Sequence, residues 1–98
     1  MTITKNIEGT TCTLLVEGRL DTTTAPEFDR CTESIPAEVT DLVLDFEKLE
    51  YISSAGLRVL LKLQKVMSRR GSMKVLHVNE MIAEVFSITG FDSILTIE

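Results

Sequence analysis

A strand–helix–strand pattern in the second half of the sequence constrains the fold more than any other feature. Residues 55–70 carry apolar side chains at helical spacing, and Gly71 follows them as a helix C-cap would. A short apolar run at 41–46 precedes this predicted helix, and another at 73–78 follows it. Two strands joined through a helix lie parallel in one sheet. The pattern therefore predicts an α/β fold, in which residues 41–46 form a central strand covered on both faces.

The first half of the sequence predicts a hairpin and one more helix. A weakly alternating segment at 3–7 and a strand-like segment at 11–20 flank a turn at residues 8–10. Thr24 is placed to cap the helix that follows, and Pro36 is placed to end it. The apolar residues of this predicted helix are Ala25, Phe28, Cys31 and Ile35.

The C-terminal quarter completes the pattern. Asn79 is expected to cap a third helix that ends at Gly90, and residues 93–97 supply a last strand. The apolar side of the third helix is formed by Met81, Ile82, Val85, Phe86 and Ile88. Residues 49–52 are interpreted as a connector. The resulting order is β-β-α-β-α-β-α-β, a mixed β-sheet with an N-terminal hairpin and with parallel strands joined by crossover helices. We expect residues 1–98 to form a single domain.

Charge and composition exclude several functions. The net charge is −5, tryptophan is absent and there is one tyrosine, which disfavours binding to nucleic acid. No run approaches the roughly 20 apolar residues of a membrane span, and the N-terminus lacks an apolar signal region. Cys12 and Cys31 form no metal-binding motif, and they are interpreted as buried thiols in a reducing compartment. We therefore expect a cytoplasmic protein without a metal or cofactor.

Two hydroxyl-rich loops are the candidates for function. One is residues 20–24, after the second predicted strand, and the other is residues 51–56, which lead into the longest helix. Both should lie at the carboxyl edge of the sheet, where α/β proteins bind ligands and partners. Ser54 falls at the N-cap or first turn of that helix, where backbone N–H groups of residues 55–57 and the helix dipole would accommodate a phosphate. The plainer interpretation is an ordinary capping serine.

An enzymatic function is disfavoured by the lack of a base for Ser54. The only histidine, His77, lies in a strand-like segment and is expected to be half-buried, and residues 52–56 lack the glycine of a nucleophile elbow. The acidic residues Asp45, Glu47 and Glu50 are interpreted as a strand end and a solvated loop. A basic ridge, defined by Arg58, Lys62, Lys65 and Arg69, is either a solvated helix face or a binding surface for an acidic partner.

Three segments resemble the STAS domain family, whose members include sulfate transporters and anti-sigma factor antagonists. Residues 16–26 resemble its strand-and-turn signature, residues 42–57 resemble its phosphorylation loop and following helix, and residues 73–91 are similar to its C-terminal part. The resemblance covers essentially the whole chain. It implies a mixed sheet with helices, and in the antagonist branch it implies partner switching.

In that branch, the unmodified protein binds an anti-sigma factor, often a serine kinase, and thereby frees a sigma factor. The family motif is Asp-Ser-Ser/Thr-Gly-Leu with its first hydroxyl phosphorylated, so the resemblance makes Ser54 the acceptor, with Ser53 at the aspartate position and Ala55 at the second hydroxyl. A serine phosphatase would reset the switch. The predicted partner-binding residues are Asp21, Thr22, Thr23, Ser53, Ser54, Ala55, Gly56 and Arg58.

Two alternatives use the same surface without phosphorylation. One is a STAS subunit docked on a transport ATPase, which would use the surface only for binding. The other is a small-molecule sensor, which predicts a closed pocket near Asp21 and Ser54.

Overall fold

The computed structural model describes all 98 residues and has the mixed α/β architecture predicted from the sequence. It opens with an antiparallel hairpin of β1 (Thr2–Glu8) and β2 (Thr11–Leu20). The other elements are α1 (Ala25–Glu33), β3 (Asp41–Asp45), β4 (Leu49–Ile52), α2 (Ser54–Arg70), β5 (Ser72–Leu76), α3 (Glu80–Thr89) and a 3-10 turn, η1 (Phe91–Ser93).

The strands form one five-stranded sheet with β2 at its centre. The order along the sheet is β1-β2-β3-β5, and β4 pairs in parallel with the C-terminal part of β2, with a shift of register between Gly18 and Arg19. The β2–β3 and β3–β5 pairs are also parallel, with Thr13 opposite Val43 and Val43 opposite Lys74. Helices α1 and α2 supply the crossovers that this parallel arrangement requires.

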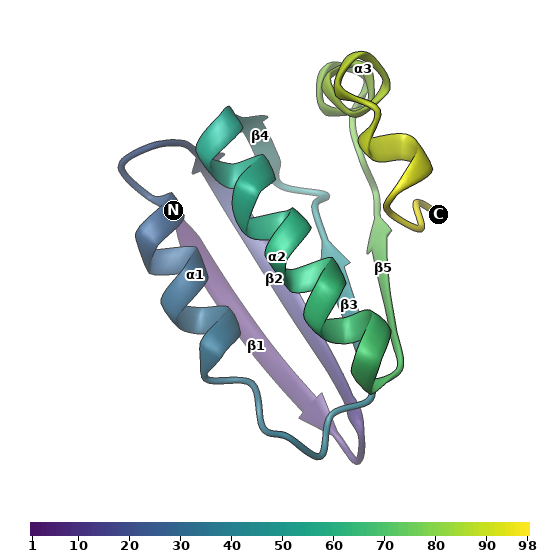
Figure 1. The fold of residues 1–98 in the computed structure, drawn as a ribbon. Coiled ribbons are helices and arrows are strands. Elements are labelled where there is room, and N and C mark those ends of the chain that lie inside the picture. The colour runs from purple at the N-terminus through teal and green to yellow at the C-terminus, as the bar shows by residue number, and fades with distance from the viewer.

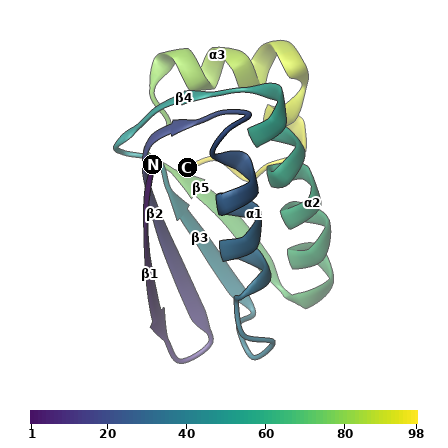
Figure 2. The same ribbon diagram turned by 90° about the vertical axis from the view of Figure 1, so that its left-hand side faces the viewer.

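Both crossover helices pack on the same face of the sheet (Figures 1 and 2). The core between the two layers is apolar. Its main side chains are Cys12, Leu14 and Val16 of β2, Leu42 and Leu44 of β3, Val75 of β5, Phe28 of α1, and Leu57, Leu60, Leu63 and Met67 of α2. The opposite face carries the half-buried Val43 and Lys74 and the exposed Asp41. The prediction that residues 41–46 are covered on both faces is therefore wrong, because no helix lies over that side of β3.

Two strand predictions fail for physical reasons. Residues 49–52 form β4 rather than a connector, because they pair in parallel with the C-terminal part of β2. A segment of four residues is too short to show the alternation that would identify a strand in the sequence. The predicted last strand, 93–97, is reduced to one bridge between Ile97 and Val75. The chain turns instead through η1, where the Phe91 ring stacks on Phe86 with 6.5 Å between centroids.

The three helices follow the predicted pattern with local differences. Thr24 is the N-cap residue of α1 as expected, but its side chain makes no capping hydrogen bond to the helix. α1 ends at Glu33, so Ile35 is buried beyond the helix rather than on its stripe. In α3, Ile82 and Phe86 are buried as predicted, whereas Met81 is 54% and Ile88 is 78% exposed. The cysteines are unpaired, Cys12 buried and Cys31 half-buried. None of the helices combines the length and apolar character needed to cross a bilayer.

Asn79 ties α3 to the sheet as well as capping it. Its Oδ1 accepts a hydrogen bond from the Ile82 N–H at 2.8 Å, which is the predicted cap. Its Nδ2 donates to the Leu49 carbonyl of β4 at 3.0 Å. One side chain therefore fixes the start of α3 against the strand that leads to Ser54.

Candidate functional site

The two candidate loops leave adjacent strands at the same edge of the sheet, as expected. Leu20, the last residue of β2, lies opposite Ile52, the last residue of β4. The Ser53 N–H extends this pairing by donating to the Leu20 carbonyl at 2.9 Å. The start of α2 is therefore held beside the loop that begins at Asp21.

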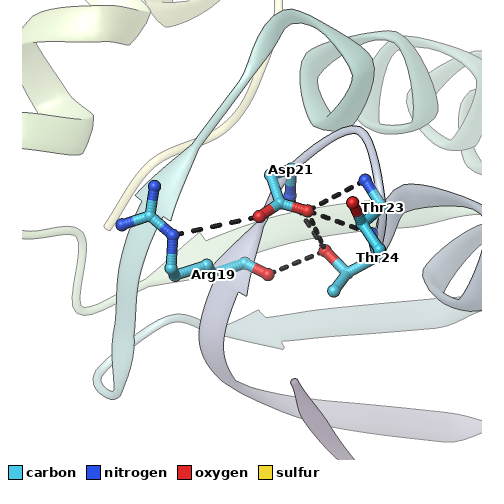
Figure 3. Close-up of polar contacts among 4 residues, drawn as sticks. All are labelled: Arg19, Asp21, Thr23 and Thr24. Atoms are coloured by element: carbon cyan, nitrogen blue, oxygen red, sulfur yellow. Dashed lines mark hydrogen bonds and ion pairs between the residues drawn. The ribbon is translucent and has the colours of Figure 1, made fainter.

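Asp21 organises its loop through reciprocal hydrogen bonds (Figure 3). Its Oδ1 accepts from the backbone N–H groups of Thr23 at 3.0 Å and Thr24 at 3.1 Å. The Thr24 hydroxyl accepts from the Asp21 N–H at 2.9 Å and donates to the Arg19 carbonyl at 2.7 Å. The hydrogen bond from the Thr24 N–H has the largest effect on the pKa of Asp21, and together with the bond from the Thr23 N–H it holds this pKa below its ordinary value. Asp21 stays ionised and fixes the turn between β2 and α1.

A contact that the sequence did not reveal links this loop to β4. The Arg19 guanidinium carbon lies 4.3 Å from the centre of the Tyr51 ring, within the range of a cation–π interaction. Its Nε lies 3.9 Å from Asp21 Oδ2. The contact requires β4 to pair with β2, so the interpretation of residues 49–52 as a connector could not anticipate it.

Ser54 occupies the first turn of α2, with Ser53 as the N-cap residue. Ser54 is exposed, and its hydroxyl takes part in no hydrogen bond within the chain. Ser53 makes no side-chain cap, and its Oγ is buried without a partner. The Leu57 N–H bonds to the Ser53 carbonyl at 2.9 Å, so only the N–H groups before it are open at the helix start. The expectation that residues 55–57 all offer a free N–H is therefore wrong for Leu57, whose N–H is already bonded.

Gly56 explains how α2 comes so close to the strand ends. A Cβ at this position would lie 2.7 Å from Leu20 Cγ and 2.9 Å from Ile52 Cγ1. Real side chains do not approach so closely, so any larger residue must displace the Leu20 and Ile52 side chains at the ends of β2 and β4. The missing side chain sets the position of the first turn and hence of Ser54.

A groove of about 560 Å³ runs between the starts of α1 and α2. Its walls include Thr22, Ala25 and Pro26 on one side and Ala55, Arg58 and Val59 on the other. The groove therefore joins three of the predicted partner-binding residues, namely Thr22, Ala55 and Arg58. It is an open depression, whereas a small-molecule sensor was expected to have a closed pocket here.

The basic ridge on α2 is not uniform. Lys62 Nζ lies 3.0 Å from both Asp29 and Glu33 of α1, and these two carboxylates raise the pKa of Lys62. Arg58, one turn closer to Ser54, makes no ion pair or hydrogen bond within the chain. The free positive charge of the ridge nearest to the candidate site is therefore that of Arg58.

His77 differs from its predicted environment. It lies just beyond β5 with a φ of 59°, and its side chain is 56% exposed rather than half-buried. Its Nδ1 lies 2.9 Å from Asp45 Oδ1. The ligand atoms of Asp45, Glu47 and His77 lie within 4.8 Å of one another and could offer one nitrogen and two oxygens to a cation. The Asp45–His77 hydrogen bond already accounts for this closeness.

The Asp45–His77 pair predicts a specific pH dependence of stability. The hydrogen bond to Asp45 raises the pKa of His77 above its ordinary 6.5. Burial alone would raise the pKa of Asp45, but the His77 and Glu47 hydrogen bonds lower it below 3.8. The His77 contribution is complete below pH 6.5 and is lost as the pH rises through the raised value. The Asp45 contribution is present above pH 3.8 and is lost as the pH falls through the lowered value.

We expect wild type to lose more thermal stability than His77→Asn as the pH rises from 6 to 8. Asparagine tolerates the left-handed backbone at this position, so the comparison isolates the charge. The measurement is Tm by circular dichroism across that range. Asp45→Asn, which keeps an oxygen for the Glu47 N–H, should show the same flattened profile. Parallel profiles for all three proteins would contradict the assignment.

The family model described as the STAS domain matches residues 2–98. The chain belongs to the STAS domain family. The family match confirms the resemblance found in the sequence. The STAS domain is also 42% identical over 57 residues to a Bordetella bronchiseptica protein, BtrV, which is named as an anti-sigma factor antagonist. That alignment covers 57% of this chain and 49% of BtrV, so the chain spans about half the length of this curated relative.

Solved structures show the same fold at lower identity. An anti-sigma factor antagonist from Mycobacterium paratuberculosis matches with a TM-score of 0.88 and 21% identity, over 98% of this chain and 83% of that one. The unphosphorylated form of the anti-sigma factor antagonist SpoIIAA matches with a TM-score of 0.82 and 18% identity, over 99% and 88%. The phosphorylated form of SpoIIAA, a Bacillus cell fate determinant, matches with 0.76 and 17%, over 99% and 91%. The α/β arrangement of this STAS domain is therefore the one that these proteins share.

Proposed function

We propose that this STAS domain is an anti-sigma factor antagonist that works by partner switching. In the unmodified state it binds an anti-sigma factor that is also a serine kinase, and the sigma factor is released for transcription. Phosphorylation of Ser54 by the kinase separates the two proteins, and a serine phosphatase restores the binding form. The switch acts in the cytoplasm and carries out no catalysis of its own.

The observation that carries this proposal is the position of Ser54. Its hydroxyl is exposed and free of hydrogen bonds, so it is open to a kinase. It lies in the first turn of a 17-residue helix, where backbone N–H groups and the helix dipole favour a negative charge. The BtrV relative is named as an anti-sigma factor antagonist, and SpoIIAA has been solved with and without phosphate. These names support the same function for this chain.

The interface is expected to combine the Asp21 loop with the start of α2. Thr22 and Thr23 are exposed beside the groove, and Ala55 and Arg58 form its other wall. Phosphate adds about −1.5 to −2 charges to Ser54. The N-terminus of α2 stabilises this negative charge, so the fold is expected to stay unchanged. The added bulk and charge act on the bound partner instead.

The test is to find the phosphate on the protein. Cleavage by trypsin after Lys48 and Arg58 would yield a peptide that contains both Ser53 and Ser54. After incubation with the cognate kinase and ATP, we expect this peptide to gain one phosphate, located on Ser54 by fragmentation. Ser54→Ala should abolish the gain, and the matched control Ser53→Ala should retain it. Phosphate on Ser53, or labelling that survives Ser54→Ala, would contradict the proposal.

A second candidate is a STAS subunit that binds a transport ATPase and is never phosphorylated. It is favoured by Ser53, which stands where the family motif has an aspartate and whose Oγ is buried without a partner. A missing carboxylate at this position would weaken recognition by a kinase. Complete lack of labelling with each serine kinase of the cell, together with retained partner binding by Ser54→Asp, would favour this candidate.

A further inference from the structure

Arg58 is one of four cations, with Arg30, Lys65 and Arg69, that make no ion pair or side-chain hydrogen bond within the chain, and it is the one nearest to Ser54 along the sequence. Lys62 is held by two carboxylates, Lys48 lies 3.3 Å from Glu17, and Arg19 stacks on Tyr51. Arg58 is exposed and has no such contact. Its five N–H donors form a planar fork that suits a carboxylate or a phosphate. The unused group lies beside the proposed switch.

The spacing along α2 places Arg58 within reach of Ser54. The two residues are four positions apart on one helix, so their Cβ atoms lie about 5–6 Å apart. An anion placed N-terminal to a cation at this spacing is the favourable order, because it also matches the helix dipole. A phosphate on Ser54 could therefore accept hydrogen bonds from the Arg58 guanidinium without any movement of the backbone.

The first turn of α2 also lacks the negative charge that the other helices carry. α1 has Glu27 and α3 has Glu80 in the first turn, whereas α2 has no acidic residue there. Arg58 adds a positive charge near that end, which is unfavourable with the helix dipole. A phosphate on Ser54 would correct both features at once.

We propose that Arg58 exchanges between two anions: a carboxylate of the partner protein when Ser54 is unmodified, and the phosphate of Ser54 after modification. This inference rests on the proposed function of Ser54 and specifies how that site is regulated. Arg58 lines the groove together with the apolar Ala55 and Val59, so a partner seated there would contact its charge. Phosphorylation then withdraws an attractive group from the interface as well as adding a repulsive one.

The test uses the full chain with phosphoserine installed at position 54 by chemical synthesis. Titration of the phosphate is followed by ³¹P NMR in this protein and in its Arg58→Gln variant. Pairing with Arg58 stabilises the dianion, so we expect the second pKa of the phosphate to be about half a pH unit lower with Arg58 than without it. High salt should shrink the difference.

Arg69→Gln is the matched control, because it removes an equal charge from the same helix about 16 Å further along its axis. Its phosphate should titrate like that of the parent protein. Equal titration in the parent and Arg58→Gln proteins, or an equal effect of Arg69→Gln, would overturn the proposal. Because the phosphate is installed by synthesis, the result does not depend on a kinase. A failure of kinase labelling would therefore count against the proposed function and leave this test intact.

Discussion

Gly56→Val is expected to lower the free energy of unfolding by about 2–3 kcal/mol. A Cβ alone would lie 2.7 Å from Leu20 Cγ and 2.9 Å from Ile52 Cγ1, and valine adds two further methyl groups. Neither neighbour can retreat easily, because Leu20 is fully buried and Ile52 is 3% exposed. The measurement is urea unfolding followed by circular dichroism. The strain falls on the two strand ends that position Ser54, so partner binding should weaken as well.

The cause of this destabilisation can be tested with a second substitution. Leu20→Ala removes the Cγ atom that collides with the new side chain, although alone it costs about 2–5 kcal/mol through the cavity that it leaves. In the double variant, the valine fills part of that cavity. We expect the combined loss to be smaller than the sum of the single losses by at least about 1 kcal/mol. Strictly additive losses would show that the contact with Leu20 is not the cause.

Ser54→Asp is expected to reduce affinity for the partner about 100-fold or more while leaving the fold intact. Placing the aspartate against negatively charged groups of the partner costs several kcal/mol of binding free energy. Each 1.4 kcal/mol is a tenfold change in affinity. An acidic residue in the first turn of α2 interacts favourably with the helix dipole, so Tm should stay the same or rise slightly. Ser54→Asn is the control, because it has the same size without the charge and should bind far better than the aspartate variant.

The sequence predicts the three helices of this protein well because they carry strong periodicity, whereas the prediction that helices cover both faces of the sheet is wrong. The buried residues Leu57, Leu60, Leu63 and Met67 of α2 follow a helical spacing, although Leu61, which was expected on the same face, is only half-buried. Asn79 caps α3 as expected. β4 escapes prediction because four residues cannot display a strand period, and only pairing with β2 makes them a strand. The C-terminal strand is lost because the Phe91–Phe86 contact turns the chain into η1 instead.

The candidate site is predicted in part for the same reason. The rule that parallel strands end at one edge correctly brings the Asp21 loop beside the start of α2. Sequence cannot show which side chains satisfy one another across that edge. The Arg19–Tyr51 contact, the pairing of Lys62 with α1 and the unpaired Arg58 all depend on how strands and helices meet. These contacts distinguish a structural cation from one that is free to bind a partner.

The most direct test of the central claim is the affinity of the anti-sigma factor, captured from the native cells, for two forms of this STAS domain. One form is unmodified, and the other carries phosphoserine at position 54. Isothermal titration calorimetry gives Kd for each. We predict tight binding of the unmodified form and binding at least about 100-fold weaker for the phosphorylated form. Equal affinities would contradict the account, because Ser54 would then have no part in the choice of partner.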